Sequence, residues 1–477
     1  MDSPTRERVL KIEENAQKKS YLVNHPTKNE LSKMNEIIYD FIIKNKRIVL
    51  GGSAINAILK NNGKEGIYPT KLETLNDIYD VEFFSTTPID DIHFLCDLIF
   101  DAGFEQVFGD EAIHKNTYTI RYFSIGVCDI TYMPANLYPF IPRKVIDKVT
   151  YCSPHFLMVD FYRARSNPTN SFWNLSKFME RQYLIKQSYP EFTIKKDCTK
   201  DNFKNLSIAE NICHHLGSEL LPDDIFIPIG TYATNIMLDS STHSDDKRFP
   251  VKILRMICFD LRKGLEKAKS AIEKIGNKMD ISITEAKWTE YVPFFEYYGD
   301  SLSCSLSING KLQEVLRLYS NRDRCLPTIN YNGLQMPSFD VIIVFWYYIW
   351  IRDLVEKTKI STAPCAIAHL LEVQRLEETN AVKGGKKRRK KKDKQAKSKE
   401  NISKLNPLFQ TLRETCIGEE DHFLSARSLE RSKKKQEGKL PIYRYNPLNG
   451  KRSPGKYIFE NISGNPIINQ SKHKYLN

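Results

Sequence analysis

Two acidic residues, separated by one residue, lie in a strand-like segment where Asp80 and Glu82 alternate with apolar Val81 and Phe83. Side chains at i and i+2 of a strand point to the same face, so these two carboxylates should project together. A third acid, Asp129, lies among apolar residues of another strand-like segment. If the two strands are neighbours, the three carboxylates could bind two divalent ions, which activate an attacking hydroxyl and stabilise leaving pyrophosphate. Acids on the solvent face of an edge strand are equally ordinary, so neither motif decides the matter alone.

A glycine-rich turn precedes these acids, at Gly51-Gly52-Ser53. It follows a short apolar segment, 47–50, and leads into a helix-like segment, 54–60. Absent side chains let backbone N–H groups approach a phosphate at the positive end of a helix, and the Ser53 hydroxyl would add one more donor. Gly-Gly-Ser is also a common plain turn, so this motif alone is weak.

The elements around these motifs predict a small mixed sheet. Alternating apolar residues indicate strands at 80–85, 117–123 and 127–132, and helical periodicity lies between them at 90–102. Together with strand 47–50 and helix 54–60, this order predicts an α+β fold with helices on one face of the sheet.

The second half of the chain has enough apolar residues for a core of its own. Helical periodicity at 171–183 places Lys177 and Arg181 four residues apart, where they could reach nucleotide phosphates or simply form an exposed basic face. Longer helices are expected at 253–272 and 338–358. We expect an N-terminal helical extension at 1–35, a catalytic domain at 36–187, a second α/β domain at 188–378, and a C-terminal arm at 379–477.

Positive charge is concentrated in that arm. The chain carries a net charge of +13. Residues 383–399 hold eleven Lys or Arg against one Asp, and residues 427–456 hold ten against two Glu, which leaves the rest of the chain negative. A lysine-rich segment of this kind should be disordered when free. Aromatic residues among the basic ones, such as Tyr443 and Tyr445, suit single-stranded nucleic acid. A solubilising or targeting role for the arm stays open.

The N-terminus is charged from Asp2 to Lys19, which is not the pattern of a signal peptide. The longest apolar run, Val341 to Ile351, is shorter than the ~18 residues that a membrane span needs. We therefore expect a protein that does not span a membrane.

The order of the motifs resembles the nucleotidyltransferase superfamily of DNA polymerase β. More narrowly, the segments Val49-Leu50-Gly51-Gly52-Ser53, Tyr79-Asp80-Val81-Glu82-Phe83-Phe84-Ser85 and Asp129-Ile130-Thr131-Tyr132-Met133-Pro134 are similar to the poly(A) polymerase catalytic subunits of large cytoplasmic DNA viruses. The similarity covers about residues 36–185, and more loosely the second domain and the Tyr445-Asn446-Pro447-Leu448 segment.

The resemblance implies a nucleotidyltransferase fold with a second domain that is a degenerate copy of the first. It implies Asp80, Glu82 and Asp129 as catalytic metal ligands for two Mg2+ or Mn2+ ions, and Gly52 and Ser53 as triphosphate contacts. Gly51 of the same turn, and Lys177 and Arg181 on the helix that follows the catalytic sheet, are further candidate nucleotide-binding residues by their positions. It also implies ATP as substrate, a single-stranded RNA 3′ end as acceptor, and the host cytoplasm or the virion as location. Whether the enzyme is a homodimer or needs a processivity subunit is left open.

Two departures from the family pattern keep alternatives open. The gap from Gly52 to Asp80 is longer than usual, so Asp77 is a rival for the first ligand, and Glu82 stands where many members have Asp. Another nucleotidyltransferase, CCA-adding or oligoadenylate-forming, fits the same motifs. So does a non-catalytic RNA-binding subunit with a decayed fold.

Overall fold

The computed structural model divides by its contacts into two compact units. Unit 1 contains residues 1–157 and 428–459, and unit 2 contains residues 158–427 and 460–477. The structure describes residues 3–24, 26–68, 79–112, 116–123, 125–166, 174–189, 192, 206–241, 248–279, 286–291, 299–308, 310–320, 326–358, 361–389, 405–411 and 444–449. This division by contacts groups residues 175–187 with unit 2, whereas the sequence placed them in the catalytic domain. The domain limits expected from the sequence stay predictions.

Unit 1 is built on an eight-stranded mixed sheet in the order β15-β3-β4-β5-β2-β1-β7-β6. Its strands are β1 (Ile48–Leu50), β2 (Val81–Ser85), β3 (Val107–Glu111), β4 (Thr117–Tyr122), β5 (Ile125–Tyr132), β6 (Arg143–Ile146), β7 (Val149–Cys152) and β15 (Arg444–Tyr445). Its helices are α1 (Ser3–Asn24), α2 (Lys28–Lys44), α3 (Gly51–Asn61), α4 (Pro88–Asp101) and the start of α5 (Pro154–Ser166). The predicted mixed sheet is therefore present, with β3, β6, β7 and β15 in addition to the strands expected.

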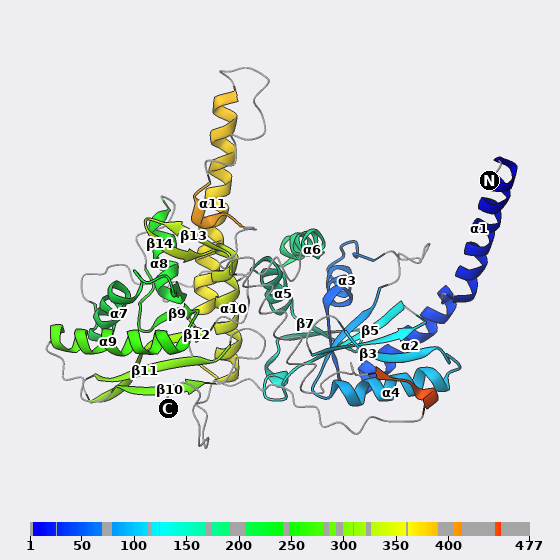
Figure 1. The fold of residues 1–477 in the computed structure, drawn as a ribbon, viewed down its shortest axis with the longest axis horizontal. Coiled ribbons are helices and arrows are strands. Elements are labelled where there is room, and N and C mark those ends of the chain that lie inside the picture. The colour runs from blue at the N-terminus through cyan, green and yellow to red at the C-terminus, as the bar shows by residue number, and fades with distance from the viewer. Residues whose placement is uncertain are drawn as a thin grey trace. The chain divides into compact units, whose positions relative to one another are not determined.

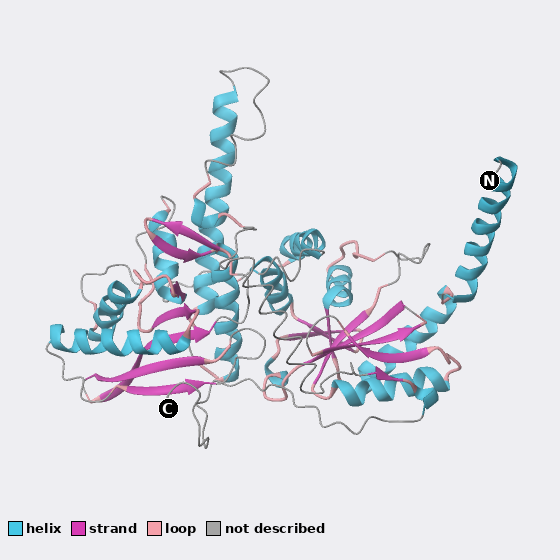
Figure 2. Cartoon of the chain, viewed as in Figure 1, coloured by secondary structure: helices cyan, strands magenta, loops and turns pink. Residues whose placement is uncertain are grey.

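Helices cover both faces of this sheet, not one as expected. Figures 1 and 2 show α3 on one side of the strands and α4 on the other. Helix α2 packs beside α4 through a stripe of buried residues that includes Met34, Ile38 and Phe41. Strand β1 is apolar on both faces, because Val49 lies on one face, Ile48 and Leu50 lie on the other, and all three are buried, so a second layer of helix is required.

The helix expected at 253–272 is wrong in its first part. Residues Leu254–Cys258 form strand β9, and helix α9 begins only at Leu261. A short buried strand and the apolar start of an amphipathic helix cannot be told apart by periodicity, which is why the two elements were merged. The helix expected at 338–358 is confirmed as α10 (Phe339–Val355).

Unit 2 contains a five-stranded sheet in the order β10-β11-β12-β9-β8. The strands are β8 (Phe226–Ile229), β9, β10 (Lys287–Tyr291), β11 (Ser301–Ile308) and β12 (Lys311–Ser320), with a separate hairpin of β13 (Thr328–Tyr331) and β14 (Leu334–Pro337). The helices are α6 (Leu175–Ser188), α7 (Ile208–Leu220), α8 (Gly230–Ser240), α9 (Leu261–Met279), α10 and α11 (Ala363–Arg389). A second core, between the sheet and helices α7 and α9, confirms the expected second α/β body.

Three parts of the basic arm are described, residues 379–389, 405–411 and 444–449. Helix α11 continues to Arg389, so residues 379–389 are helical rather than disordered, which agrees with the high helix propensity of Lys and Arg. Strand β15 pairs antiparallel with β3 at the edge of the unit 1 sheet, and the Tyr445 hydroxyl donates to Asp97 at 2.5 Å while its ring lies 4.2 Å from that of His93. Residues 390–404, 412–443 and 450–477, including Tyr443, lie outside the described residues.

Among the described residues, no helix combines the length and the apolar character needed to cross a membrane.

Candidate active site

The three predicted carboxylates meet on unit 1. Asp80, Glu82 and Asp129 each offer an oxygen, and these atoms all lie within 4.8 Å of one another. Strands β2 and β5 run parallel with Glu82 opposite Asp129, and Asp80 precedes the first residue of β2 on the same face as Glu82. The condition that the sequence left open, whether the two strands are neighbours, is met. All three side chains are partly buried, which suits a site that a charged substrate must reach.

The glycine turn lies directly against this cluster. Strand β1 pairs antiparallel with β2, with Leu50 opposite Glu82, so the chain turns into α3 above the Glu82 side chain. Gly51 has φ +61°, in the left-handed region, and a methyl group on it would lie 1.3 Å from Glu82 Oε2. The Gly52 N–H donates to the same oxygen at 3.0 Å. Glycine is thus required at residue 51 for both its backbone angle and its lack of a side chain.

The predicted phosphate donors are therefore engaged with the cluster. The Gly52 N–H is bound to Glu82, and the Ser53 hydroxyl donates to the Asp80 carbonyl oxygen at 3.4 Å. The Tyr39 phenol also exchanges a hydrogen bond with Ser53. The triphosphate role of Gly51, Gly52 and Ser53 stays a prediction, and it would require Glu82 to release the Gly52 N–H.

The electrostatics of Asp129 are those of a carboxylate in a group of acids. Burial raises the pKa of Asp129 to about 6, and the negative charge of Asp80 adds to the rise, whereas a hydrogen bond from Thr119 and the charge of Arg121 oppose it. Thr119 stands opposite Asp129 on β4, and neither it nor Arg121 was picked out from the sequence. Only the strand register could have found Thr119, because the two residues are ten positions apart.

We expect the Asp129→Asn variant to be more stable than the wild type at neutral pH in the absence of divalent ions. The folded-state pKa of about 6 lies above the ~3.9 of an unfolded chain, so the wild type loses stability as the pH rises from about 4 to 6. The expected gain in free energy of unfolding at pH 7.5 is on the order of 2 kcal/mol, shrinking to nothing near pH 4. Urea unfolding in EDTA at several pH values measures it. A gain that does not depend on pH would contradict the assigned cause.

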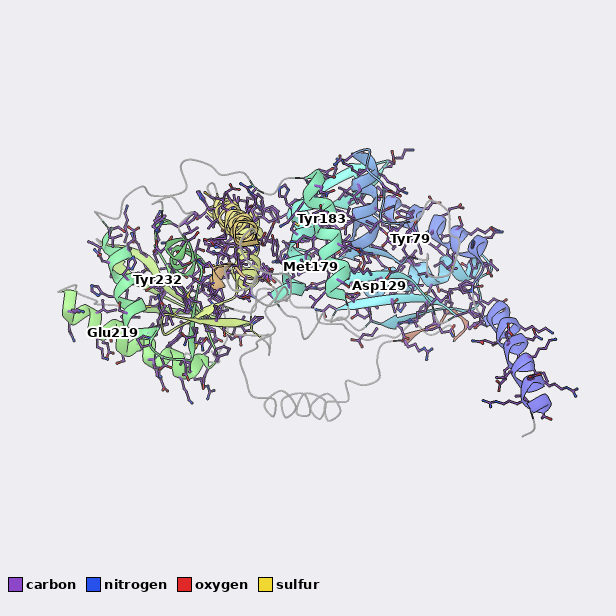
Figure 3. The ribbon with its side chains drawn as sticks, turned by 90° about the horizontal axis from the view of Figure 1, so that it is seen from above. Tyr79, Asp129, Met179, Tyr183, Glu219 and Tyr232 are labelled. Atoms are coloured by element: carbon purple, nitrogen blue, oxygen red, sulfur yellow. The ribbon has the colours of Figure 1, made fainter. Side chains whose placement is uncertain are left out.

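The other predicted site residues, Lys177 and Arg181, do not belong to unit 1, which contains the cluster. Lys177 and Arg181 lie on α6, which belongs to unit 2 and carries the labelled Met179 and Tyr183 in Figure 3, where Asp129 is labelled on unit 1. Lys177 is exposed and Arg181 is partly buried. Their role as phosphate contacts stays a prediction. Asp77, the rival first ligand, lies outside the described residues.

The two ends of the segment that contains Asp77 are held together by aromatic rings. Tyr68 and Tyr79 stack with their centroids 4.0 Å apart and their planes 8° apart, and Tyr79 directly precedes Asp80. The Tyr68 N–H donates to the Asn56 side chain on α3 at 3.2 Å. These contacts show how the unusually long gap between Gly52 and Asp80 is closed without moving Asp80 away from Glu82.

The site agrees with a known family. Residues 36–171 match the poly(A) polymerase catalytic subunit family. The chain carries a poly(A) polymerase catalytic subunit domain. The match covers the glycine turn and all three carboxylates, which are the residues on which the resemblance rested.

The similarity to relatives and to a solved structure extends beyond this poly(A) polymerase domain. A protein of Acanthamoeba polyphaga mimivirus, a poly(A) polymerase catalytic subunit by name, is 26% identical over 97% of this chain and 82% of its own length. A protein of the same name from African swine fever virus is 30% identical over 38% of each chain. The crystal structure of the Megavirus polyadenylate synthase superposes with a TM-score of 0.73 at 25% identity, over 98% of this chain and 93% of that one. The nucleotidyltransferase fold and the enzyme class predicted from the sequence are thereby confirmed.

Proposed function

We propose that this protein is a template-independent polynucleotide adenylyltransferase that adds AMP from ATP to the 3′ ends of RNA. The observation that carries the proposal is the group of three carboxylates, Asp80, Glu82 and Asp129, facing a glycine turn at the start of α3. A decayed fold has no reason to keep three partly buried acids within 4.8 Å, because each raises the cost of charging its neighbours.

The donor set fits divalent metal ions of the hard class. Only carboxylate oxygens are offered, which Mg2+ and Mn2+ prefer, and burial together with the charge of Asp80 raises the pKa of Asp129 despite the opposing charge of Arg121, so a cation bound there would be favoured. Asp80, Glu82 and Asp129 would hold the ions. Bound there, two such ions would lower the pKa of the RNA 3′-hydroxyl and offset the charge of the triphosphate.

The residues of the chain have separate tasks in this proposal. Asp80, at the open start of β2, and Asp129 face the position of the attacking hydroxyl. Glu82 is the member of the cluster that contacts the glycine turn. If it released the Gly52 N–H, that donor would be exposed to the triphosphate at the positive end of α3. The reaction is then an in-line attack on the α-phosphate of ATP with pyrophosphate leaving, and no covalent protein intermediate is needed.

Incubation of the purified chain with a labelled RNA oligonucleotide, each ribonucleotide separately, and Mg2+ or Mn2+ tests the proposal. We expect extension with ATP in preference to the other three, and none in excess EDTA. Equal use of all four nucleotides would favour a general nucleotidyltransferase, and addition of two residues from CTP with little extension from ATP would indicate a CCA-adding enzyme. Activity in EDTA would refute the metal mechanism.

We further propose that the basic arm holds the RNA between additions. Each phosphate neutralised on a single strand contributes about −0.7 to the slope of log affinity against log salt. Deleting residues 383–477 would also remove β15 from the unit 1 sheet, so the sharper variant replaces the seven cationic residues 386–392 with Gln. We expect a flatter salt dependence of RNA binding and shorter tails per binding event, with ATP use on a saturating short primer retained. An unchanged slope would make the arm a targeting or solubility element.

The cytoplasm of an infected host cell is the proposed place of action, because the named relatives are viral proteins.

A further inference from the structure

The five-stranded sheet of unit 2 repeats the order of five consecutive strands in the eight-stranded sheet of unit 1. The order β10-β11-β12-β9-β8 corresponds to β3-β4-β5-β2-β1, with the same parallel pair in the same place. Helices α3 and α8 both have 11 residues, and each begins on a glycine of positive φ, Gly51 at +61° and Gly230 at +66°. Even the β-bulge recurs, since β5 and β12 each skip one residue, Val127 and Val315, against the neighbouring strand.

The repeated register identifies the residues that stand in place of the catalytic acids. In unit 1, Leu50 is opposite Glu82, and Glu82 is opposite Asp129. In unit 2, Ile229 is opposite Arg255, and Arg255 is opposite Arg317. Arg255 therefore replaces Glu82, Arg317 replaces Asp129, and Ile253, two residues before Arg255, replaces Asp80. A position that carries three negative charges in unit 1 carries two positive charges in unit 2.

One of these two arginines is paired with a carboxylate within the protein. The Arg317 guanidinium donates to both Glu314 oxygens, at 2.6 Å and 3.0 Å, and lies 4.4 Å from the centre of the Tyr291 ring. Such a two-pronged ion pair is the geometry in which arginine binds a carboxylate most strongly. Arg317 thus needs no ligand.

Arg255 is different. Within the described part of the chain it has no ion pair and no hydrogen bond, and its Nε is shielded from solvent without an acceptor. Burial lowers the pKa of Arg255, and the positive charges of Arg352 and Arg317 act in the same direction against the opposing influence of Tyr319 and Glu314. Arginine stays protonated in proteins, so Arg255 holds a positive charge that forms no direct ion pair with a carboxylate of the described residues, since the nearby Glu314 is paired with Arg317.

Arg255 lies beneath the first residue of α8, as Glu82 lies beneath that of α3. A methyl group on Gly230 would be 3.4 Å from Arg255 Cδ. The next residue, Thr231, is only 6% exposed, and its hydroxyl has no hydrogen-bond partner among the residues that the structure describes. Buried polar groups normally find partners, so two unsatisfied groups beside one helix start indicate a missing acceptor. The first N–H groups of α8 supply further donors and the positive end of the helix.

We propose that Arg255, Thr231 and the start of α8 bind a phosphate-type oxyanion, in the position that corresponds to the metal cluster of unit 1. A guanidinium, a hydroxyl and helix N–H groups are all donors, which excludes a metal ion and matches phosphate oxygens. The phosphate comes from an RNA backbone or from a free nucleotide or inorganic phosphate. The site does not depend on adenylate transfer, so its test is independent of the proposed function.

Binding is measured on the full chain carrying Asp80→Asn and Asp129→Asn, in EDTA, so that metal-dependent nucleotide binding at unit 1 does not contribute. The probes are inorganic phosphate, ATP, and an oligoadenylate without terminal phosphates. Their binding is measured by calorimetry and by the rise in melting temperature. We expect Arg255→Gln to weaken phosphate binding at least tenfold and Thr231→Val to weaken it severalfold, which are typical losses for hydrogen bonds to a charged group. Arg262→Gln removes an exposed arginine of the same unit and should leave binding unchanged.

Competition identifies the source of the phosphate. Displacement of inorganic phosphate by the oligoadenylate supports a backbone site, and displacement by ATP alone supports a nucleotide site. The Arg255→Met variant distinguishes anion binding from a structural role of Arg255. Without anion, its melting temperature should equal or exceed that of the parent protein. With phosphate, it should not show the rise in melting temperature that the parent shows. Equal phosphate binding by the Arg255→Gln and Arg262→Gln variants, or no saturable binding to the parent, overturns the proposal.

Discussion

Replacing either Asp80 or Asp129 with Ala is expected to abolish adenylate transfer, by about a thousandfold or more, while the protein stays folded. Each residue contributes an oxygen to the same cluster, so losing one removes both charge and geometry from the place where ions would bind. The melting temperature should stay near that of the wild type or rise, because removing one acid relieves the repulsion that raises the pKa of Asp129. Extension of labelled RNA and thermal melting, run on the same preparations, measure the two effects.

The exposed Asp101 at the end of α4 offers a matched control, since Asp101→Ala removes one carboxylate of the same unit away from the cluster. Its activity should be that of the wild type. Asp77→Ala should also be mild. A complete loss in Asp77→Ala with near-normal activity in Asp80→Ala would mean that Asp77 is the first ligand, and near-normal activity in both Asp80→Ala and Asp129→Ala would end the assignment.

The second large effect is expected from Gly51→Ala, which should lower adenylate transfer at least a hundredfold. The added methyl group would occupy the place of Glu82 Oε2, 1.3 Å away, so the carboxylate must leave both the Gly52 N–H and its place in the cluster. Alanine at φ +61° also costs about 1 kcal/mol of backbone strain. Steady-state rates with ATP and RNA, together with the melting temperature, separate these two contributions.

Gly230→Ala is the control that the repeated fold provides. Gly230 has nearly the same φ, +66°, but the contacts of an added methyl group there are 3.3 Å or longer. This variant should lose a few degrees of melting temperature to strain and keep its activity. If Gly51→Ala and Gly230→Ala lose activity to the same extent, strain rather than the displacement of Glu82 is responsible, and the glycine turn has no special relation to the cluster.

Strong local patterns account for what could be predicted. The alternation of Asp80, Val81, Glu82 and Phe83 places two acids on one face wherever the strand lies, because the side-chain period of a strand is two. The glycine turn followed by the helical segment expected at 54–60 is an equally local signal, and it forms as α3. These elements form in the structure within a few residues of their expected limits.

Other elements depend on partners far along the chain. Strand β15 has two residues, and it pairs with β3 more than three hundred positions earlier, a contact that Tyr445 strengthens through Asp97 and His93. The sequence pattern does not separate strand β9 from helix α9, because apolar and polar residues do not alternate regularly along β9. Backbone pairing decides such elements, and backbone pairing leaves little trace in a single sequence.

The sequence alone therefore determined the chemistry of this protein: the acids, the glycine turn, and the basic arm follow from residue types and short spacings. Only the tertiary structure decided that Glu82 and Asp129 are neighbours on parallel strands, that the Gly52 N–H is held by Glu82, and that Arg255 and Arg317 stand in the corresponding places of unit 2. The physical reason is that strand order and register come from packing two faces of a sheet against helices. A shift of one residue in that register would turn every one of these side chains to the other face.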